Sequence, residues 1–136
     1  MQKVYLAGGM RVDWREGIKK ECKGLVFFCP VDKESSQVMS VDEYGTWDLH
    51  YIKQADILFG YMERTNPSGI GLACEMGMAY GMNKTVILVL EKGSEHFADD
   101  KLEFLRKVAH ITFSELQEGI NYLKTFRLKA DADSER

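Results

Sequence analysis

A single carboxylate stands in an otherwise uncharged stretch of the chain, and its isolation suggests chemistry. Glu75 is the only charged side chain between Arg64 and Lys84, in the segment GIGLACEMGMAYGM (residues 69–82). A core helix without a function would have little use for it, because burying an ionised carboxylate without partners is costly. A carboxylate presented into a partly dry cleft can act as a nucleophile toward an electrophilic carbon. The alternative is a Glu75 that faces solvent or pairs with Arg64 or Lys84.

Glycines surround this carboxylate and expose the backbone. Gly69, Gly71 and Gly77 keep side chains off one face of the helix expected over residues 69–82, so that a ligand can approach. Free N–H groups and the positive end of the helix dipole favour an anion at the start of this helix. Ser68 is a natural N-cap there and could also offer its hydroxyl to a ligand. We therefore expect a binding surface at this helix terminus.

A second candidate binding segment, AGGMR, follows the first apolar run of the chain. Gly8 and Gly9 expose N–H groups, and Arg11 supplies a cation that can bind two phosphate oxygens at once. The segment lacks the third glycine of a dinucleotide fingerprint and the lysine of a P-loop. A tight strand-to-helix turn with a solvated Arg11 is therefore the alternative interpretation.

The elements that must position these residues follow from the alternation of apolar runs with amphipathic stretches. We expect strands at residues 3–7, 24–30, 56–62, 84–90 and 110–113, and helices at residues 11–23, 42–55, 69–82, 99–109 and 114–126. Strands that are apolar throughout and alternate with helices indicate a parallel sheet covered on both faces.

We predict one α/β domain over residues 1–126, followed by a frayed tail over residues 127–136. The domain is expected to be a doubly wound, flavodoxin-like sheet of five parallel strands in the order 2-1-3-4-5, with helices on both faces. In that order the loops after the first and third strands meet where the strand order reverses. The segments 8–11 and 66–71 and the loop after the fourth strand should therefore converge on one crevice.

Composition narrows the classes of function. The formal net charge of −3 over 136 residues argues against binding long nucleic acids, which needs a basic stripe. No apolar run approaches the roughly 18 residues of a membrane span, and the first residues lack the pattern of a secretory signal, so we expect a cytoplasmic protein. Cys22, Cys29 and Cys74 have no CxxC spacing and are expected to be reduced core thiols. The three histidines sit at no ligand-like spacing from each other or from the cysteines, so we expect no metal site. As a separate expectation, no cofactor is needed.

Three segments together resemble the nucleoside 2-deoxyribosyltransferase family and its close relatives, the deoxynucleoside 5′-monophosphate N-glycosidases. They are VYLAGGMR, WDLHYIKQADILFGYM and NPSGIGLACEMGMAYGMNKTVILV, and the resemblance spans about residues 3–91. The last segment is the most specific: a Ser/Gly turn, a Glu followed by x-Gly-x-Ala, and then a Lys-led apolar strand. The order and separations of the three segments agree with the family.

The resemblance implies catalytic roles for three residues. The family's glutamate that attacks the anomeric carbon of a 2-deoxyribosyl group matches Glu75. The aspartate that helps to hold and protonate the departing base matches Asp48, which by pattern alone would be a surface residue. The tyrosine that lies beside the nucleophile matches Tyr5, which by pattern alone would be a core residue.

The resemblance also implies substrate-binding positions. Ser68 sits where transferases tend to carry an aspartate for the sugar hydroxyls, and where monophosphate-specific members have a phosphate-contacting serine. Gly9 and Arg11 sit where the latter members grip phosphate. The turn between Ser68 and Glu75 is one residue longer than is usual in the family.

The implied function is transfer of a 2-deoxyribosyl group between nucleobases through a covalent glycosyl-glutamate intermediate. The alternatives are hydrolysis of the N-glycosidic bond of deoxynucleoside 5′-monophosphates, and a binding module that senses nucleotides without chemistry. The implied partners are a nucleoside or nucleotide and a free base. Family members form homodimers or larger homo-oligomers in which a neighbour's loop closes the pocket. By position that loop is EKGSEHFADD, with Ser94 and His96 as candidates.

Overall fold

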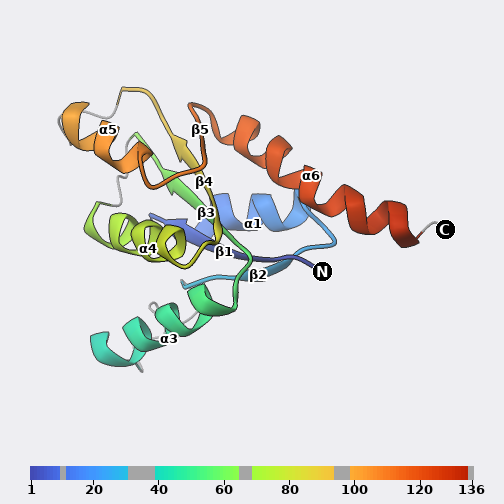
Figure 1. Ribbon diagram of the computed structural model, residues 1–136, viewed down its shortest axis with the longest axis horizontal. Helices are drawn as coiled ribbons and strands as arrows, with labels where there is room; N and C mark the ends of the chain where they lie inside the picture. The colour runs from blue at the N-terminus through green and yellow to red at the C-terminus, as the bar shows by residue number, and fades with distance from the viewer. Residues whose placement is uncertain (10–11, 31–38, 65–68, 94–98, 135–136) are drawn as a thin grey trace.

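The structure is a computed structural model that describes residues 1–9, 12–30, 39–64, 69–93 and 99–134. Strands and helices alternate along these residues (Figure 1). The strands are β1 (Lys3–Gly8), β2 (Val26–Phe28), β3 (Ile57–Met62), β4 (Thr85–Leu90) and β5 (Ile111–Phe113). The helices are α1 (Val12–Glu21), α3 (Val41–Gln54), α4 (Ile70–Gly81), α5 (Asp99–Arg106) and α6 (Leu116–Ser134).

The five strands form one parallel sheet in the order β2-β1-β3-β4-β5, which confirms the predicted fold. In the register of this sheet Tyr5 lies opposite Phe28 on one side and Leu58 on the other. Gly8, the last residue of β1, lies opposite Tyr61 of β3. The chain order reverses between β1 and β3, so the carboxyl ends of these two strands mark the crevice where such sheets bind ligands.

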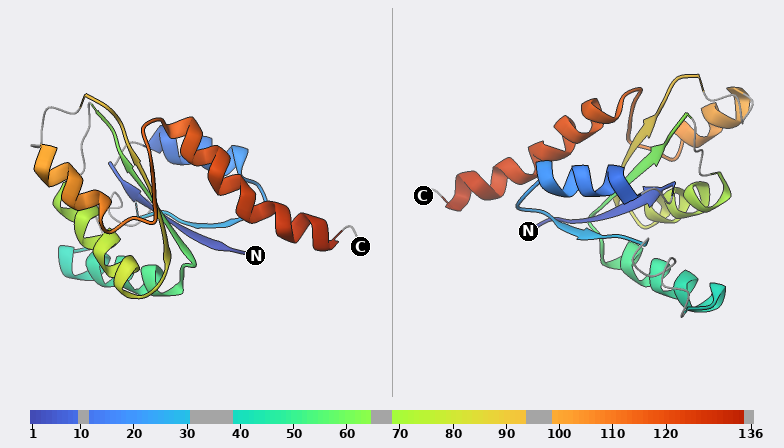
Figure 2. Two further views of the ribbon diagram at one scale, coloured as in Figure 1. Left: turned by 45° about the horizontal axis from the view of Figure 1, so that its top comes forward. Right: turned by 180° about the vertical axis from the view of Figure 1, so that it is seen from behind.

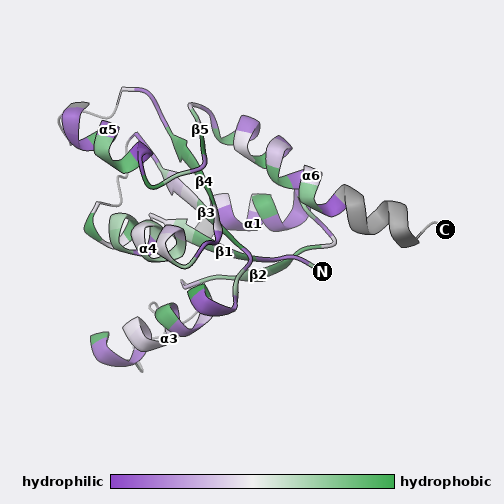
Figure 3. Ribbon diagram, viewed as in Figure 1, coloured by the Kyte–Doolittle hydropathy of each residue, from purple (hydrophilic) through white to green (hydrophobic). Residues whose placement is uncertain are grey.

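Helices cover both faces of the sheet. The views in Figure 2 place α1 and α6 on one face, and α3, α4 and α5 on the other. Alternate strand residues point to opposite faces, so Leu6 and Phe59 join the core under α1 and α6, while Tyr5 and Leu58 join the core under α3 and α4. Because both faces are covered, the strands are hydrophobic along their length, as Figure 3 shows for the centre of the sheet.

Local interactions explain where two helices begin and pack. The α3 helix starts with a capping box, in which Ser40 Oγ accepts from the Glu43 N–H at 3.2 Å and Glu43 Oε1 accepts from the Ser40 N–H at 2.9 Å.

The α6 helix approaches the sheet at Gly119, where a Cβ atom would lie 2.4 Å from Val89 Cγ2. Only a residue without a side chain allows this close contact.

The structure differs from the sequence-based expectations at three places. Strand β2 is three residues long, because its pairing with β1 ends at Phe28. Helix α6 continues past residue 126, its expected end, to Ser134. Cys22 and Cys29 are buried as expected, but Cys74 is exposed on α4, so the expectation of three core thiols is wrong for Cys74.

Candidate active site

A hydrogen bond between Tyr5 and Glu75 lies at the centre of the candidate site. The Tyr5 hydroxyl donates to Glu75 Oε2 with an oxygen–oxygen distance of 2.5 Å. Tyr5 is fully buried in β1, whereas Glu75 is half-buried on α4. The distance is at the short end for an O–H···O bond, which is typical of an ionised acceptor. The pair therefore places a carboxylate, held by a buried phenol, beside the strand at which the chain order reverses.

The position of Glu75 on α4 explains its partial burial. The residues that α4 buries against the sheet are Leu72, Met76 and Ala79. Glu75 lies three residues after Leu72 and four before Ala79, so its side chain belongs to the sheet-facing side of the helix. The alternative of a fully solvated Glu75 is excluded by this placement.

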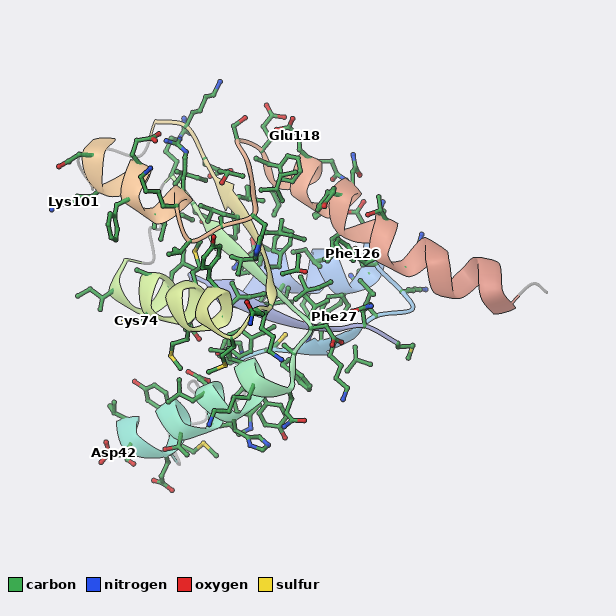
Figure 4. The ribbon with its side chains drawn as sticks, viewed as in Figure 1. Phe27, Asp42, Cys74, Lys101, Glu118 and Phe126 are labelled. Carbon is green, nitrogen blue, oxygen red and sulfur yellow. The ribbon has the colours of Figure 1, made fainter. Side chains whose placement is uncertain are left out.

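Asp48 is brought to the same face of the sheet from the neighbouring helix. It is one of the two buried residues of α3, the other being Ile52, and it is 8% exposed. The α3 and α4 helices pack against each other and against β1. Figure 4 shows these two helices side by side, with Asp42 labelled at the start of α3 and Cys74, the residue before Glu75, on α4. Aspartate is seldom buried to this extent unless its carboxyl group is paired.

The turn after β1 has a backbone that only glycine accepts. Gly8 has a φ of +144°, and a Cβ atom on it would lie 2.3 Å from the Tyr61 carbonyl oxygen. The carbonyl oxygen of the buried Gly9 accepts hydrogen bonds from Trp14 Nε1 at 3.0 Å and from Arg15 Nη1 at 2.6 Å. Arg11, the expected phosphate-binding cation of this turn, lies outside the described residues.

The start of α4 differs in one detail from the expectation. Gly69 is the N-cap residue, without a side-chain capping bond, so α4 begins after Gly69 and the expected N-cap, Ser68, is not the cap. Ser68 itself lies outside the described residues. Gly71 and Gly77 have open space where a Cβ would be.

A further buried group, Arg15, was not anticipated from the sequence. It is 1% exposed, and it donates to the carbonyl oxygens of Leu6, Gly8 and Gly9. Arg15 lies three residues before Ile18, a fully buried position of the same helix. That spacing was the available signal, because it places a charged residue on the buried side of α1.

A polar cluster at the ends of β3 and β4 was also missed. The Tyr61 hydroxyl donates to Glu91 Oε2 at 2.9 Å, and Glu91 Oε1 accepts from the Arg64 N–H at 2.9 Å. Burial and then the hydrogen bond to Glu91 raise the pKa of Tyr61 well above its ordinary value. Tyr61 therefore remains a neutral hydrogen-bond donor at physiological pH.

Two cavities adjoin this cluster, at the carboxyl ends of β4 and β5. One is about 680 Å³ and the other about 320 Å³, and Glu91, Lys92 and Ser114 line both. A third, apolar cavity of about 330 Å³ lies between α4 and α5 and is lined in part by Gly69 and Ile70. The residues that line these three cavities include neither Tyr5 nor Glu75. We base the candidate site on the Tyr5–Glu75 pair because it lies beside β1, where the strand order reverses and where sheets of this kind bind ligands.

Two kinds of feature are absent from the described residues. In that part of the chain no three His, Cys, Asp or Glu side chains gather as a metal site would require. No helix in the same residues has the length and apolar character needed to cross a membrane.

The chain belongs to the nucleoside 2-deoxyribosyltransferase-like family, whose model matches residues 1–93. These residues include β1, α3 and α4, and hence Tyr5, Asp48 and Glu75. No curated protein matches the chain.

Solved structures with a similar fold agree with this family. A 2-deoxyribosyltransferase from Leishmania mexicana is 15% identical, with a TM-score of 0.68 over 92% of this chain and 98% of that one. A CMP N-glycosidase from Clostridium botulinum is 22% identical, with a TM-score of 0.63 over 92% of this chain and 99% of that one. A conserved protein from Enterococcus faecalis V583 is 18% identical, with a TM-score of 0.69 over 92% of this chain and 98% of that one. At these identities the likeness concerns the fold alone.

Proposed function

We propose that this protein transfers a 2-deoxyribosyl group from one nucleobase to another, with Glu75 as the nucleophile. The observation that carries the proposal is the 2.5 Å hydrogen bond from the buried Tyr5 hydroxyl to Glu75 Oε2, at the point where the strand order reverses. Membership of the nucleoside 2-deoxyribosyltransferase-like family supports it. The substrates are a deoxynucleoside and a free base.

The first step forms a covalent intermediate. A Glu75 carboxylate oxygen attacks C1′ of the sugar, the bond from C1′ to the base nitrogen breaks, and its electron pair leaves with the base. Asp48, in its protonated form, gives its proton to the departing base nitrogen. The products of this step are a neutral free base, a glycosyl ester on Glu75 and an ionised Asp48.

The second step reverses the first with another base. A nitrogen of the acceptor base attacks C1′, the ester bond to Glu75 breaks, and its electron pair returns to the carboxylate. Asp48 takes the proton that the acceptor nitrogen loses. Two displacements at C1′ retain the configuration of the glycosidic bond.

Tyr5 has a supporting role in both steps. Its hydroxyl fixes the orientation of the Glu75 carboxylate and stabilises the ionised form that attacks. Because Tyr5 is fully buried in a central strand, it orients Glu75 without having to be ordered when substrate binds.

A second candidate function is hydrolysis of a deoxynucleoside 5′-monophosphate, with water in place of the acceptor base. The glycine turn at the end of β1, where Gly8 has a φ of +144°, favours it, because glycine turns can bring backbone N–H groups close to a phosphate. A structural neighbour of this chain is a CMP N-glycosidase, which adds support. Arg11 and Ser68 are the further phosphate contacts that this candidate predicts.

Product analysis separates the two reactions. The protein is incubated with deoxyinosine and adenine together, and in parallel with each deoxynucleoside 5′-monophosphate alone. Deoxyadenosine and hypoxanthine as products support transfer, whereas free base and deoxyribose 5-phosphate support hydrolysis. Nucleotide binding without any turnover would contradict both reactions and indicate a sensor.

The nucleophile is tested by trapping the intermediate. Mass spectrometry of protein quenched during turnover should find one sugar adduct, on the peptide that contains Glu75. The Glu75→Gln variant should have neither the adduct nor activity, while Glu103→Gln, which changes an exposed carboxylate on α5, should keep both. Full activity of Glu75→Gln would remove Glu75 from the mechanism.

A further inference from the structure

The buried guanidinium group of Arg15, on α1, supports the turn after β1. Arg15 is 1% exposed. Its Nε and Nη2 atoms each lie 3.4 Å from the Leu6 carbonyl oxygen, Nη2 lies 3.2 Å from that of Gly8, and Nη1 lies 2.6 Å from that of Gly9. One side chain therefore binds three carbonyl groups of the last part of β1 and of the turn that follows.

This arrangement continues the sheet where strand pairing stops. Strand β2 pairs with β1 only as far as Phe28, which lies opposite Tyr5. Beyond that point Arg15 takes the place of a strand partner for the carbonyl groups of Leu6 and Gly8. The planar fork of a guanidinium can serve several acceptors at once, which a lysine ammonium on its flexible stem does less well.

Neighbouring aromatic residues complete the support of the turn. Trp14 Nε1 donates to the same Gly9 oxygen at 3.0 Å, and the Arg15 guanidinium carbon lies 4.4 Å from the centre of the Trp14 ring. The Trp14 ring packs edge-on against Tyr61, with ring centres 5.1 Å apart, and the Tyr61 backbone leaves no room for a side chain on Gly8. The turn is thus confined by α1 on one side and by β3 on the other.

The direction of these bonds also fixes the direction of the next N–H group. In a trans peptide the N–H points opposite to the carbonyl of the same peptide group. The Gly8 carbonyl points to Arg15, so the N–H of Gly9 points away from Arg15, toward β3, where Gly8 lies opposite Tyr61. A cation bound to the carbonyl end of a peptide polarises the group and strengthens its N–H as a donor.

We propose that Arg15 is a positioning residue for substrate. It draws the carbonyl oxygens of Leu6, Gly8 and Gly9 toward α1, and so keeps the Gly8–Gly9 turn in the shape that binds the 5′-phosphate of a nucleoside monophosphate. Its positive charge beneath the turn favours that anion over an uncharged 5′-hydroxyl. This inference rests on the second function proposed above, because that function places the substrate phosphate at this turn.

Paired ligands test the proposal without requiring turnover. Dissociation constants are measured by calorimetry for the four deoxynucleoside 5′-monophosphates and for the four matching deoxynucleosides, with the wild-type protein and with Arg15→Lys. We expect Arg15→Lys to weaken monophosphate binding about tenfold or more, since the lysine keeps the charge but not the three-carbonyl geometry. Binding of the matching deoxynucleoside should change by less than about twofold.

A second variant and a control separate positioning from folding. Arg15→Ala removes the guanidinium, and millimolar guanidinium ion should restore a measurable part of its monophosphate affinity. Lys20→Met, which removes an exposed cation from the same helix, should leave both affinities unchanged.

Three results would overturn the proposal. In the first, the wild-type protein binds both members of each ligand pair equally or binds neither. In the second, Arg15→Lys weakens both ligands by the same factor together with a lower melting temperature, which is the behaviour of a purely structural residue. In the third, Arg15→Lys leaves the ratio of the two affinities unchanged. An absence of turnover with a preserved monophosphate preference would contradict the proposed reaction and leave the role of Arg15 supported.

Discussion

The Tyr5 hydroxyl and the Glu75 carboxylate form a 2.5 Å hydrogen bond although 70 positions separate them in the sequence. The donor comes from a central strand and is rigid, whereas the acceptor comes from a helix and is half-buried. The hydrogen bond therefore joins a rigid donor on the sheet to a carboxyl group on the helix that covers it.

The Tyr5→Phe variant tests the contribution of this hydrogen bond to catalysis. The ring remains, so packing is kept, but the charged acceptor loses its donor. A hydrogen bond to a charged group contributes about 1.5–3 kcal/mol, so we expect kcat to fall about tenfold to a hundredfold. Steady-state exchange assays measure this, with thermal unfolding as the check on folding. A kcat equal to that of the wild type would show that Tyr5 does not orient the nucleophile.

The Asp48→Asn variant tests proton donation to the departing base. Asparagine keeps the shape of the side chain but cannot transfer a proton, so kcat should fall about a hundredfold or more. The matched control is Asp42→Asn, which changes an exposed aspartate in the first turn of the same helix and should leave kcat unchanged. Substrates whose bases leave without protonation should be affected least. Equal losses for all leaving groups would argue against an acid role.

The Gly8→Ala variant tests the shape of the turn after β1. At a φ of +144°, with the new Cβ atom 2.3 Å from the Tyr61 carbonyl oxygen, the backbone must move. We expect the free energy of unfolding to fall by about 2 kcal/mol or more, measured in urea. Gly17→Ala in α1 is the control, because nothing lies within 4 Å of its Cβ position and alanine favours helix. Gly17→Ala should be neutral or stabilising, and equal destabilisation of both variants would contradict the geometry.

The Tyr61→Phe variant tests the raised pKa of a buried phenol. Its pKa is raised in the folded protein, so the neutral form is favoured there, and the resulting stability is complete below the unfolded-state pKa of about 10. As the pH rises from about 10 toward the folded-state pKa, this stability is lost. The free energy of unfolding of the wild type should therefore decline more steeply above pH 10 than that of Tyr61→Phe. Parallel declines in the two proteins would exclude a titrating Tyr61. At neutral pH the variant should lose about 1 kcal/mol with the Glu91 hydrogen bond.

The order of the strands and the position of α4 could be predicted from the sequence, because both depend on local patterns. Continuous apolar runs indicate buried parallel strands, and the isolation of Glu75 among apolar residues indicates a special carboxylate. The length of β2 was overestimated because burial extends beyond pairing: Leu25 and Cys29 are buried, but only Val26–Phe28 pair with β1. Hydrophobicity alone does not distinguish a buried residue that pairs with a neighbouring strand from one that is buried without pairing.

The missed residues depend on contacts between distant parts of the chain. Arg15 is a charged residue on a helix, which usually indicates a solvated face, and its acceptors are backbone carbonyl groups that leave no trace in the sequence. Tyr61 and Glu91 meet across 30 positions at the ends of neighbouring strands. The roles of Arg11 and Ser68 stay predictions, since both lie outside the described residues.

The separation of Tyr5 from Glu75 along the chain also affects how this protein folds. In the folded chain the two residues lie on β1 and on α4, the helix that follows β3, which pairs with β1. Parallel pairings between distant segments form slowly, because the entropy of closing a long loop is lost before the pairing contacts stabilise the structure. A nascent chain that stops short of α4 therefore carries the phenol but not its carboxylate, and recovery of activity after dilution from denaturant would report directly on completion of the central strands.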